Sequence, residues 1–237
     1  MAPSWFELLA WVALGLGFAS ALAIAADIVV LGNRQHMTIM DVAFPLTALY
    51  LGPIALWAYF ARGRRMSRKR MHMTGAQMNE GARDSWWQVS LSDSHCGAGC
   101  ALGDIAGEWI VWATGWTIAS TALGPEYILD LPLAWAFGIL FQYFAIAPAR
   151  GQLGRLAPLG DAIKSDTLSV LSFEVGLFGW MAVAEYAIWE SPPPINSSSH
   201  WFLMQIGMIL GFATSWPVNR WLLRHGIKEP MATVEDR

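Results

Sequence analysis

The chain contains 237 residues, of which 55% are apolar and 14% are charged, and its formal net charge is -3. The low share of charged residues excludes an ordinary soluble domain, because soluble domains carry about 25% charged residues. The sequence therefore predicts an integral membrane protein whose main partner is the lipid bilayer. We do not expect it to bind nucleic acid.

Six apolar segments are long enough to cross a hydrocarbon layer of about 30 Å at ~1.5 Å per residue. They cover residues 5–31, 39–60, 97–121, 128–148, 167–190 and 201–222. The first segment begins too early and continues too long for a cleavable signal peptide, so we expect it to be retained. We predict an all-α polytopic membrane protein, with one membrane domain over residues 1–237 and a bundle of six transmembrane helices.

Basic residues indicate the orientation, because Lys and Arg near span ends are retained on the cytoplasmic side. They cluster after the second, fourth and sixth segments, namely in the run over residues 62–70, at Arg150, Arg155 and Lys164, and at Arg220, Arg224 and Lys228. The connections on the opposite side contain only Arg34. This pattern predicts a cytoplasmic loop over residues 61–94 and two cytoplasmic termini. It also accounts for the basic run as a topology signal that lies on anionic headgroups.

Both cysteines of the chain lie in one short motif before the third segment, beside His95. If this segment is helical from about Cys96, then Cys96, Cys100, Asp104 and Glu108 form one slowly drifting stripe. Thiolate and imidazole favour soft or borderline metals, and carboxylates can complete the coordination shell. The motif therefore predicts a metal site made by His95, Cys96 and Cys100 at the cytoplasmic edge, with the two carboxylates leading inward.

Three other interpretations of the motif stay open. One is that these residues polarise a substrate without a metal. The cysteines could form a redox pair, since residues four apart on a helix have Cα atoms about 6 Å from each other. Gly97 and Gly99 would then leave the amides of the first helical turn open, which lowers the pKa of a thiol. Alternatively, the small residues simply let helices pack closely in lipid.

Acidic residues within the predicted spans are a second signal, because each costs about 2.5 to 3.5 kcal/mol at the middle of a membrane. Asp104, Glu108 and Glu174 are of this kind, and no Lys or Arg falls inside a predicted span to neutralise them. They must be protonated, face water or hold a cation. Uncharged groups with ligand atoms accompany them as secondary candidates: Gln142, Met204, Gln205 and Met208.

The sequence SHCGAGCALGD at residues 94–104 resembles the hallmark of a bacterial membrane family catalogued as domain of unknown function 4396. Residues 45–53, 141–148, 166–169 and 204–212 are similar to other stretches of that family. The resemblance implies a membrane fold and a loose link to copper handling, without a settled activity. At Glu174 the chain departs from the family pattern, which has Gln there, so the resemblance requires no charge at that position.

Together these features predict a multi-pass protein of the bacterial inner (plasma) membrane that binds a soft metal and handles or transports it. Copper is the expected ion, and zinc or iron is possible. A membrane oxidoreductase or metalloenzyme that uses the same residues is the first alternative. A non-catalytic subunit of a homo-oligomer or of a larger membrane complex is the second.

Overall fold

Helices make up nearly all of the computed structural model, which describes residues 3–74, 78–79, 85–118, 122–150, 156–188, 192–231 and 233–234. The all-α prediction is confirmed, apart from two strands of two residues each that pair antiparallel. In chain order the elements are α1 (Ser4–Val29), α2 (Met40–Leu51), α3 (Pro53–Ala61), η1 (Gly63–Met66), α4 (Arg68–Thr74), β1 (Met78–Asn79), α5 (Trp86–Thr114), α6 (Leu123–Arg150), α7 (Leu156–Val183), the π-helical turn η3 (Ala184–Ile188), α8 (Ser198–Arg224) and β2 (Thr233–Val234).

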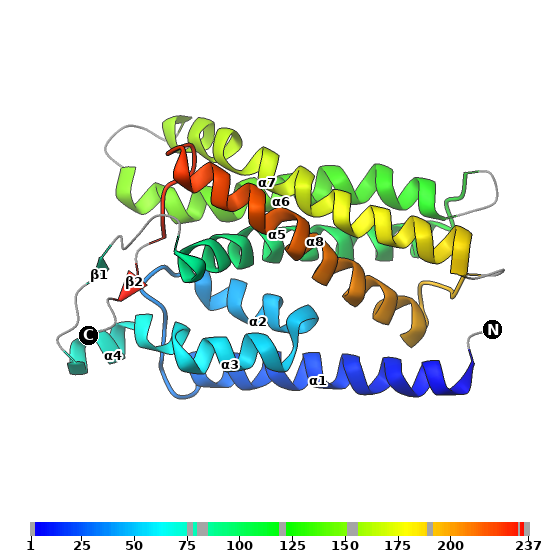
Figure 1. The fold of residues 1–237 in the computed structure, drawn as a ribbon, viewed down its shortest axis with the longest axis horizontal. Coiled ribbons are helices and arrows are strands. Elements are labelled where there is room, and N and C mark those ends of the chain that lie inside the picture. Colours follow the sequence, from blue (N-terminus) through cyan, green and yellow to red (C-terminus); the bar gives the residue numbers. More distant parts are fainter. Residues whose placement is uncertain are drawn as a thin grey trace.

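The long helices α1, α5, α6, α7 and α8 run lengthwise along the molecule, as Figure 1 shows. The helices α5 to α8 form a bundle, and α1 lies along it next to α2, α3 and α8. Among the described residues, four helices contain a stretch that is long and apolar enough to cross a membrane, namely α1, α6, α7 and α8. The fifth, α5, is just as long but carries Asp93, Asp104 and Glu108.

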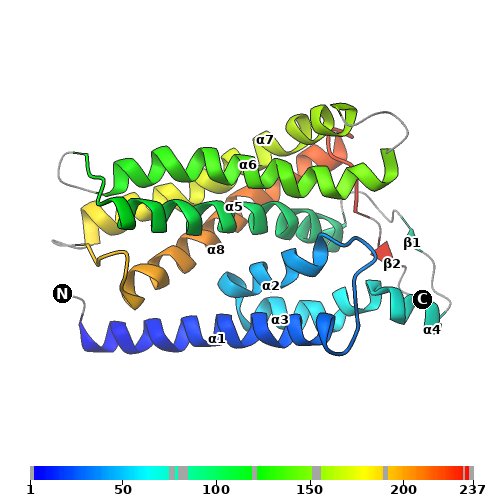
Figure 2. The same cartoon turned by 180° about the vertical axis from the view of Figure 1, so that it is seen from behind.

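The segment predicted as the second span is a helical hairpin instead of one helix. It breaks at Gly52, whose φ of 53° ends α2, and Pro53 then begins α3. The two outer ends of the hairpin meet, because the amide of His36 donates to the carbonyl of Met66 at 3.2 Å. Figure 2 shows the hairpin from behind, with α2 entering beside α1 and α3 returning to the end where α2 began. The prediction of a continuous span over residues 39–60 is therefore wrong.

This hairpin changes the end of the bundle at which the preceding helix begins. Because α2 and α3 enter and leave at the same end, α1 begins at one end of the bundle and the chain after α8 finishes at the other (Figure 1). The prediction that both termini lie on one side is thus not confirmed, because the start of α1 and the end of α8 lie at opposite ends of the bundle. Arg34, the exception to the predicted charge pattern, now lies beside the basic run, since the amide of Arg68 donates to its carbonyl at 2.9 Å.

All described Lys and Arg residues lie toward one end of the bundle, where α1, α3, α6 and α8 finish and α5 and α7 begin. We call this the basic end, and we call the other end, where α5 meets α6 and α7 meets α8, the distal end. The distal end carries acidic side chains such as Glu126 and Glu185.

The helix that holds the cysteine motif begins earlier than predicted. Ser85 caps it, with its hydroxyl accepting from the amide of Gln88 at 3.3 Å, and Gly115 ends it with a φ of 63°. The predicted loop over residues 61–94 instead contains η1, α4, β1 and the first turns of α5. Cys96 is therefore about three turns inside a helix, and the backbone amides around it are not the open amides of a helix start.

Glycines bring α5 and α6 into backbone contact. A Cβ atom at Gly103 would lie 2.3 Å from the backbone nitrogen of Ala134, and one at Gly99 would lie 2.8 Å from the Cα atom of Gly138. Such close approach through small residues is how helices pack in lipid. Gly99 therefore packs as the packing interpretation expects, and for the two cysteines that interpretation stays open.

Candidate functional site

A row of polar side chains runs along the buried face of α5. Cys96, Cys100 and Asp104 are fully buried, and Glu108 is 1% exposed. Their spacing of four residues places them on one slowly turning stripe, as predicted. We call this stripe, together with Asp93 one turn before it, the polar row. At ~1.5 Å per residue it covers roughly 22 Å of the helix.

The centre of the polar row holds two carboxyl groups without a partner. Neither oxygen of Asp104 and neither oxygen of Glu174 on α7 has a hydrogen-bond partner of normal geometry among the described residues. The charged neighbours that act most strongly on Asp104 are themselves acidic: Glu174, Asp130 and Glu108. The thiol of Cys100 lies beside both Glu174 and Cys96. Buried carboxylates that face one another in this way require a proton or another cation.

A glycine makes room for a further carboxyl group on α6. A Cβ atom at Gly107 would lie 1.8 Å from Oδ1 of Asp130, so a residue with a side chain would collide with that oxygen. Asp130 is 1% exposed, and its Oδ1 has no hydrogen-bond partner among the described residues. The glycine at position 107 of α5 therefore lets Asp130 lie against the polar row.

At the distal end the polar row meets a histidine and opens into a cavity. Nε2 of His200 on α8 lies 3.1 Å from Oε2 of Glu108, and Ser197 caps the helix by accepting from the amide of His200. A cavity of about 510 Å³ borders His200 and two more acids, Glu126 and Glu185. Glu185 belongs to η3, and π-helical turns of this kind are frequent at functional sites.

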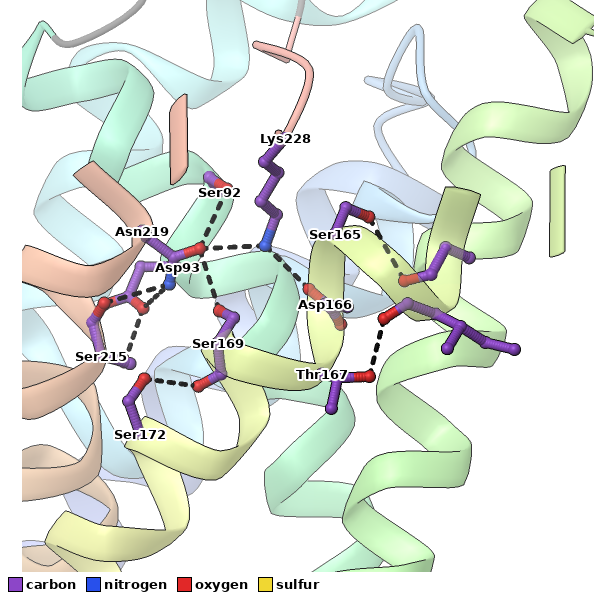
Figure 3. Close-up of polar contacts among 12 residues, drawn as sticks. Ser92, Asp93, Ser165, Asp166, Thr167, Ser169, Ser172, Ser215, Asn219 and Lys228 are labelled. Carbon is purple, nitrogen blue, oxygen red and sulfur yellow. Dashed lines mark hydrogen bonds and ion pairs between the residues drawn. The ribbon is translucent and has the colours of Figure 1, made fainter. Parts of the chain in front are cut away.

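At the basic end the row meets an ion pair that is completely buried. The ammonium of Lys228, which lies beyond the end of α8, donates to Oδ1 of Asp166 at 2.8 Å and to Oδ1 of Asn219 at 2.9 Å. Asn219 in turn donates to Asp93 at 2.7 Å, and Figure 3 shows these groups converging from α5, α7 and α8. Burial lowers the pKa of Lys228, but the negative groups around it, chiefly Asp166, raise it more, so the pKa shifts upward from 10.5.

His95 faces this basic-end group and not the cysteines. Its strongest charged neighbours are Asp166 and Lys228, and its ring packs edge-on against Phe141 with the centroids 5.9 Å apart. Both ring nitrogens are buried without a hydrogen bond of normal geometry among the described residues. Together with Gln142 and Lys228, His95 lines a cavity of about 700 Å³ at the basic end.

The family model for a domain of unknown function, DUF4396, matches residues 85–228. The chain belongs to this family. The match begins at Ser85, the residue that caps α5, and it ends at Lys228, so the DUF4396 unit is the bundle of α5 to α8 together with the buried lysine. This confirms the resemblance seen in the sequence, although residues 45–53 lie outside the match. No curated protein and no solved structure matches the chain.

Within the DUF4396 unit the predicted metal ligands are divided between two places. His95 belongs to the basic-end group, whereas Cys96 and Cys100 lie near Glu174 and Asp104 at the centre. In the parts of the chain that the structure describes, no three His, Cys, Asp or Glu side chains come together as a group that could hold a metal ion. Metal binding, by copper or by zinc or iron, stays a prediction.

The secondary candidates are all buried, but they have different surroundings. Met204 and Met208 on α8 belong to the same apolar cluster as Cys96 and Cys100. The side chain of Gln205 donates to the carbonyl of Leu49 at 2.8 Å, so it holds the tip of the hairpin against α8.

Sequence reasoning missed the polar groups that lie outside the predicted spans or at their edges. Lys228 and Asn219 carry no local motif, and Asp93 was assigned to a loop. Tyr50 was missed as well. Its hydroxyl would lie 2.6 Å from a Cβ atom at Gly97, and its ring packs in the same buried cluster as Cys96 and Cys100. The hairpin therefore places a tyrosine hydroxyl next to the cysteines. The Gly52-Pro53 pair, which breaks the helix and so forms the hairpin, was the sequence signal for this arrangement.

Proposed function

We propose that this DUF4396 protein moves a cation across the membrane along the polar row of α5. The observation that carries the proposal is the pair formed by Asp104 and Glu174, which is buried at the centre of the bundle. Neither oxygen of Asp104 has a hydrogen-bond partner among the described residues, and the hydrogen-bonding group that the described residues place beside the Glu174 carboxyl is the thiol of Cys100. A carboxylate in such a place is stable only with a proton or a metal ion on it. A chain of such groups is a common feature of proton and ion pathways.

The two cavities support a path instead of an isolated buried site. The distal cavity reaches His200 and Glu126, and the basic-end cavity reaches His95 and Lys228. Between them, the polar row places an ionisable group or thiol at intervals of about one helical turn. A cation that leaves one group therefore finds the next within a few ångströms.

The proposal includes an orientation in the bacterial inner membrane. The described Lys and Arg residues gather at the basic end, which the positive-inside rule places in the cytoplasm. With five crossings and a hairpin that re-enters from the cytoplasmic side, α1 begins on the outer side. The distal cavity then faces outward, and Lys228 lies at the cytoplasmic mouth.

The proton is the first candidate cargo, because carboxyl groups, thiols and imidazoles can all carry it. A soft metal such as copper is the second candidate. It is favoured by the sulfur atoms of Cys96, Cys100, Met204 and Met208, which lie in one buried cluster near Asp104. Thiolates and thioethers select Cu(I) over harder ions.

Flux into vesicles tests the proposal. The purified protein would be reconstituted into liposomes that contain a pH-sensitive dye or, in a second set, a Cu(I)-sensitive dye. We expect Asp104→Asn to reduce the flux at least about tenfold, a change of ~1.4 kcal/mol in the barrier. Glu174→Gln should have a smaller effect, because the family pattern that the chain resembles has Gln at this position. Glu7→Gln, at an exposed site of α1, is the matched control. The proposal would be contradicted if wild type and Asp104→Asn gave equal proton flux and also gave equal Cu(I) flux.

A further inference from the structure

Lys228 differs from the other two lysines of the chain in being buried. Lys69 and Lys164 are exposed, whereas Lys228 is 2% exposed although it lies in the segment beyond α8. Figure 3 shows its side chain reaching down between the helices to Asp166 and Asn219. An ammonium group has thus been taken out of water to fill one place in the bundle, which is costly unless that place is built for a cation.

The surroundings of the ammonium form such a place. The side-chain amide of Asn219 is held in one orientation, because it donates to Asp93 at 2.7 Å while its oxygen accepts from Ser169 at 2.9 Å. This orientation points the amide oxygen at Lys228. Asp93 is fixed in turn by the hydroxyl of Ser215 at 2.6 Å. The oxygen atoms of Asn219 and Asp93 are therefore held by partners other than the ammonium.

The group also carries more acidic side chains than its one cation can match. Asp93 and Asp166 face a single ammonium, and Oδ2 of each has no hydrogen-bond partner among the described residues. His95 lies beside them, and neither of its ring nitrogens makes a hydrogen bond of normal geometry among the described residues. The site is therefore suited to accept a positive charge, and the lysine supplies one from the protein itself.

The segment that carries Lys228 lies over the basic end of the polar row. The carbonyl of Met231 accepts a hydrogen bond from the side chain of Gln88, and β2 pairs with β1. Met231 packs into an apolar cluster with Leu91 of α5. We call residues 225–231 the C-terminal arm. Its lysine ends inside the bundle, between the polar row and the basic-end cavity.

We propose that Asp93, Asp166 and Asn219 form a binding site for a small monovalent cation, and that the ammonium of Lys228 fills this site in the resting state so that the C-terminal arm closes the path. A free cation of the size of sodium, potassium or ammonium displaces the lysine and releases the arm. The gating role rests on the proposed cation path, whereas the site itself does not.

Replacing the lysine tests the site without any transport assay. Lys228→Met keeps the length and apolar stem of the side chain and removes its charge. The thermal unfolding midpoint would be compared in sodium, potassium, ammonium and choline chloride at equal ionic strength. We expect at least one small cation to raise the midpoint of the variant by roughly 2–4 °C or more relative to choline, because it binds the folded state only. Wild type should show a smaller difference, because the ammonium of Lys228 competes with the cation for the site.

A double variant provides the matched control. Lys228→Met with Asp166→Asn removes both charges, so its midpoint should be the same in all four salts. If the single variant has the same midpoint in every salt, the cation site is wrong and the pair serves only to attach the arm. These readouts do not depend on flux, so they separate this inference from the proposed function.

A measurement on wild type applies even if the single variant does not fold. An amine-reactive reagent labels exposed lysines, and mass spectrometry compares Lys228 with Lys69 and Lys164 in the same sample. We expect Lys228 to be protected in choline chloride and to be labelled severalfold faster in the salt of the cation that binds, while the two reference lysines do not change. Labelling of Lys228 that is equal in all four salts would overturn the gating role.

Discussion

Two buried acids in this bundle, Asp166 and Asp104, have opposite surroundings. At the basic end, Asp166 is fully buried and is neutralised by Lys228 at 2.8 Å. At the centre, Asp104 is also fully buried, but the charges closest to it are acidic and its oxygens have no hydrogen-bond partner among the described residues. The residue type and the burial are the same, so the difference lies in the source of the positive charge.

This difference indicates that Asp166 has its positive counter-charge within the protein, whereas Asp104 needs a cation from outside the protein. A carboxylate with a built-in ammonium is part of the folded structure, and removing one member leaves an uncompensated charge. A carboxylate without a partner costs stability and is retained for what it binds. Stability and flux should therefore respond in opposite ways at the two places.

The largest effect on stability is expected at the basic end. Asp166→Asn removes the carboxylate that neutralises Lys228, which leaves a buried ammonium and should cost about 3–5 kcal/mol. Thermal unfolding of the purified protein measures the loss. Adding Lys228→Met to the same chain should recover much of it, since a neutral pair of similar shape has no uncompensated charge. A single variant as stable as wild type would show that the pair is not a structural ion pair.

A second, smaller effect is expected where α5 and α6 touch. Gly103→Ala would place a Cβ atom 2.3 Å from the backbone of Ala134, so the helices must separate, at a cost of about 1–3 kcal/mol. The same substitution at Gly15 of α1, which has nothing within 4 Å, should be neutral or stabilising by up to ~1 kcal/mol. Equal unfolding midpoints for the two variants would contradict the close contact between α5 and α6.

The smallest effect on stability is expected at the centre. Asp104→Asn removes an acid that has no hydrogen-bond partner among the described residues, so it should change stability by less than about 1 kcal/mol, and in the stabilising direction if the carboxyl group is a burden. Thermal unfolding beside Asp166→Asn gives the comparison directly. A loss as large as that of Asp166→Asn would mean that Asp104 has a structural partner.

Much of the fold was predictable from the sequence, because it depends on local apolar composition. The residues of α1, α6 and α8 form helices near the predicted bounds, since long apolar runs leave few alternatives in a bilayer. The helix α7 begins at Leu156, eleven residues before the predicted span over residues 167–190. The hairpin was missed because an apolar run of twenty-two residues, 39–60, looks like one span whether or not it is broken. Gly52 and Pro53 were the sign of the break, and taking that pair into account would have predicted the end of the bundle at which α1 begins.

The site was predictable only where its residues share one helix. Cys96, Cys100, Asp104 and Glu108 follow from their spacing alone, and their common burial agrees with it. The partition of His95 away from the cysteines depends on α5 beginning at Trp86 and on which helices face each side of it. Lys228 and Asp166 are sixty-two residues apart in the chain. Only the packing of α7 against α8 and the fold of the C-terminal arm bring them together.

The infrared spectrum of the purified protein tests the central claim most directly, because a protonated carboxyl group absorbs apart from an ionised one. In the absence of other cations, the account predicts a protonated-carboxyl band in wild type at neutral pH. The band should weaken in Asp104→Asn and be unchanged in Glu7→Gln and in the double variant Asp166→Asn with Lys228→Met. A wild-type spectrum without such a band, or a band that Asp104→Asn leaves unchanged, would contradict the claim that the central acid of this bundle carries a cation.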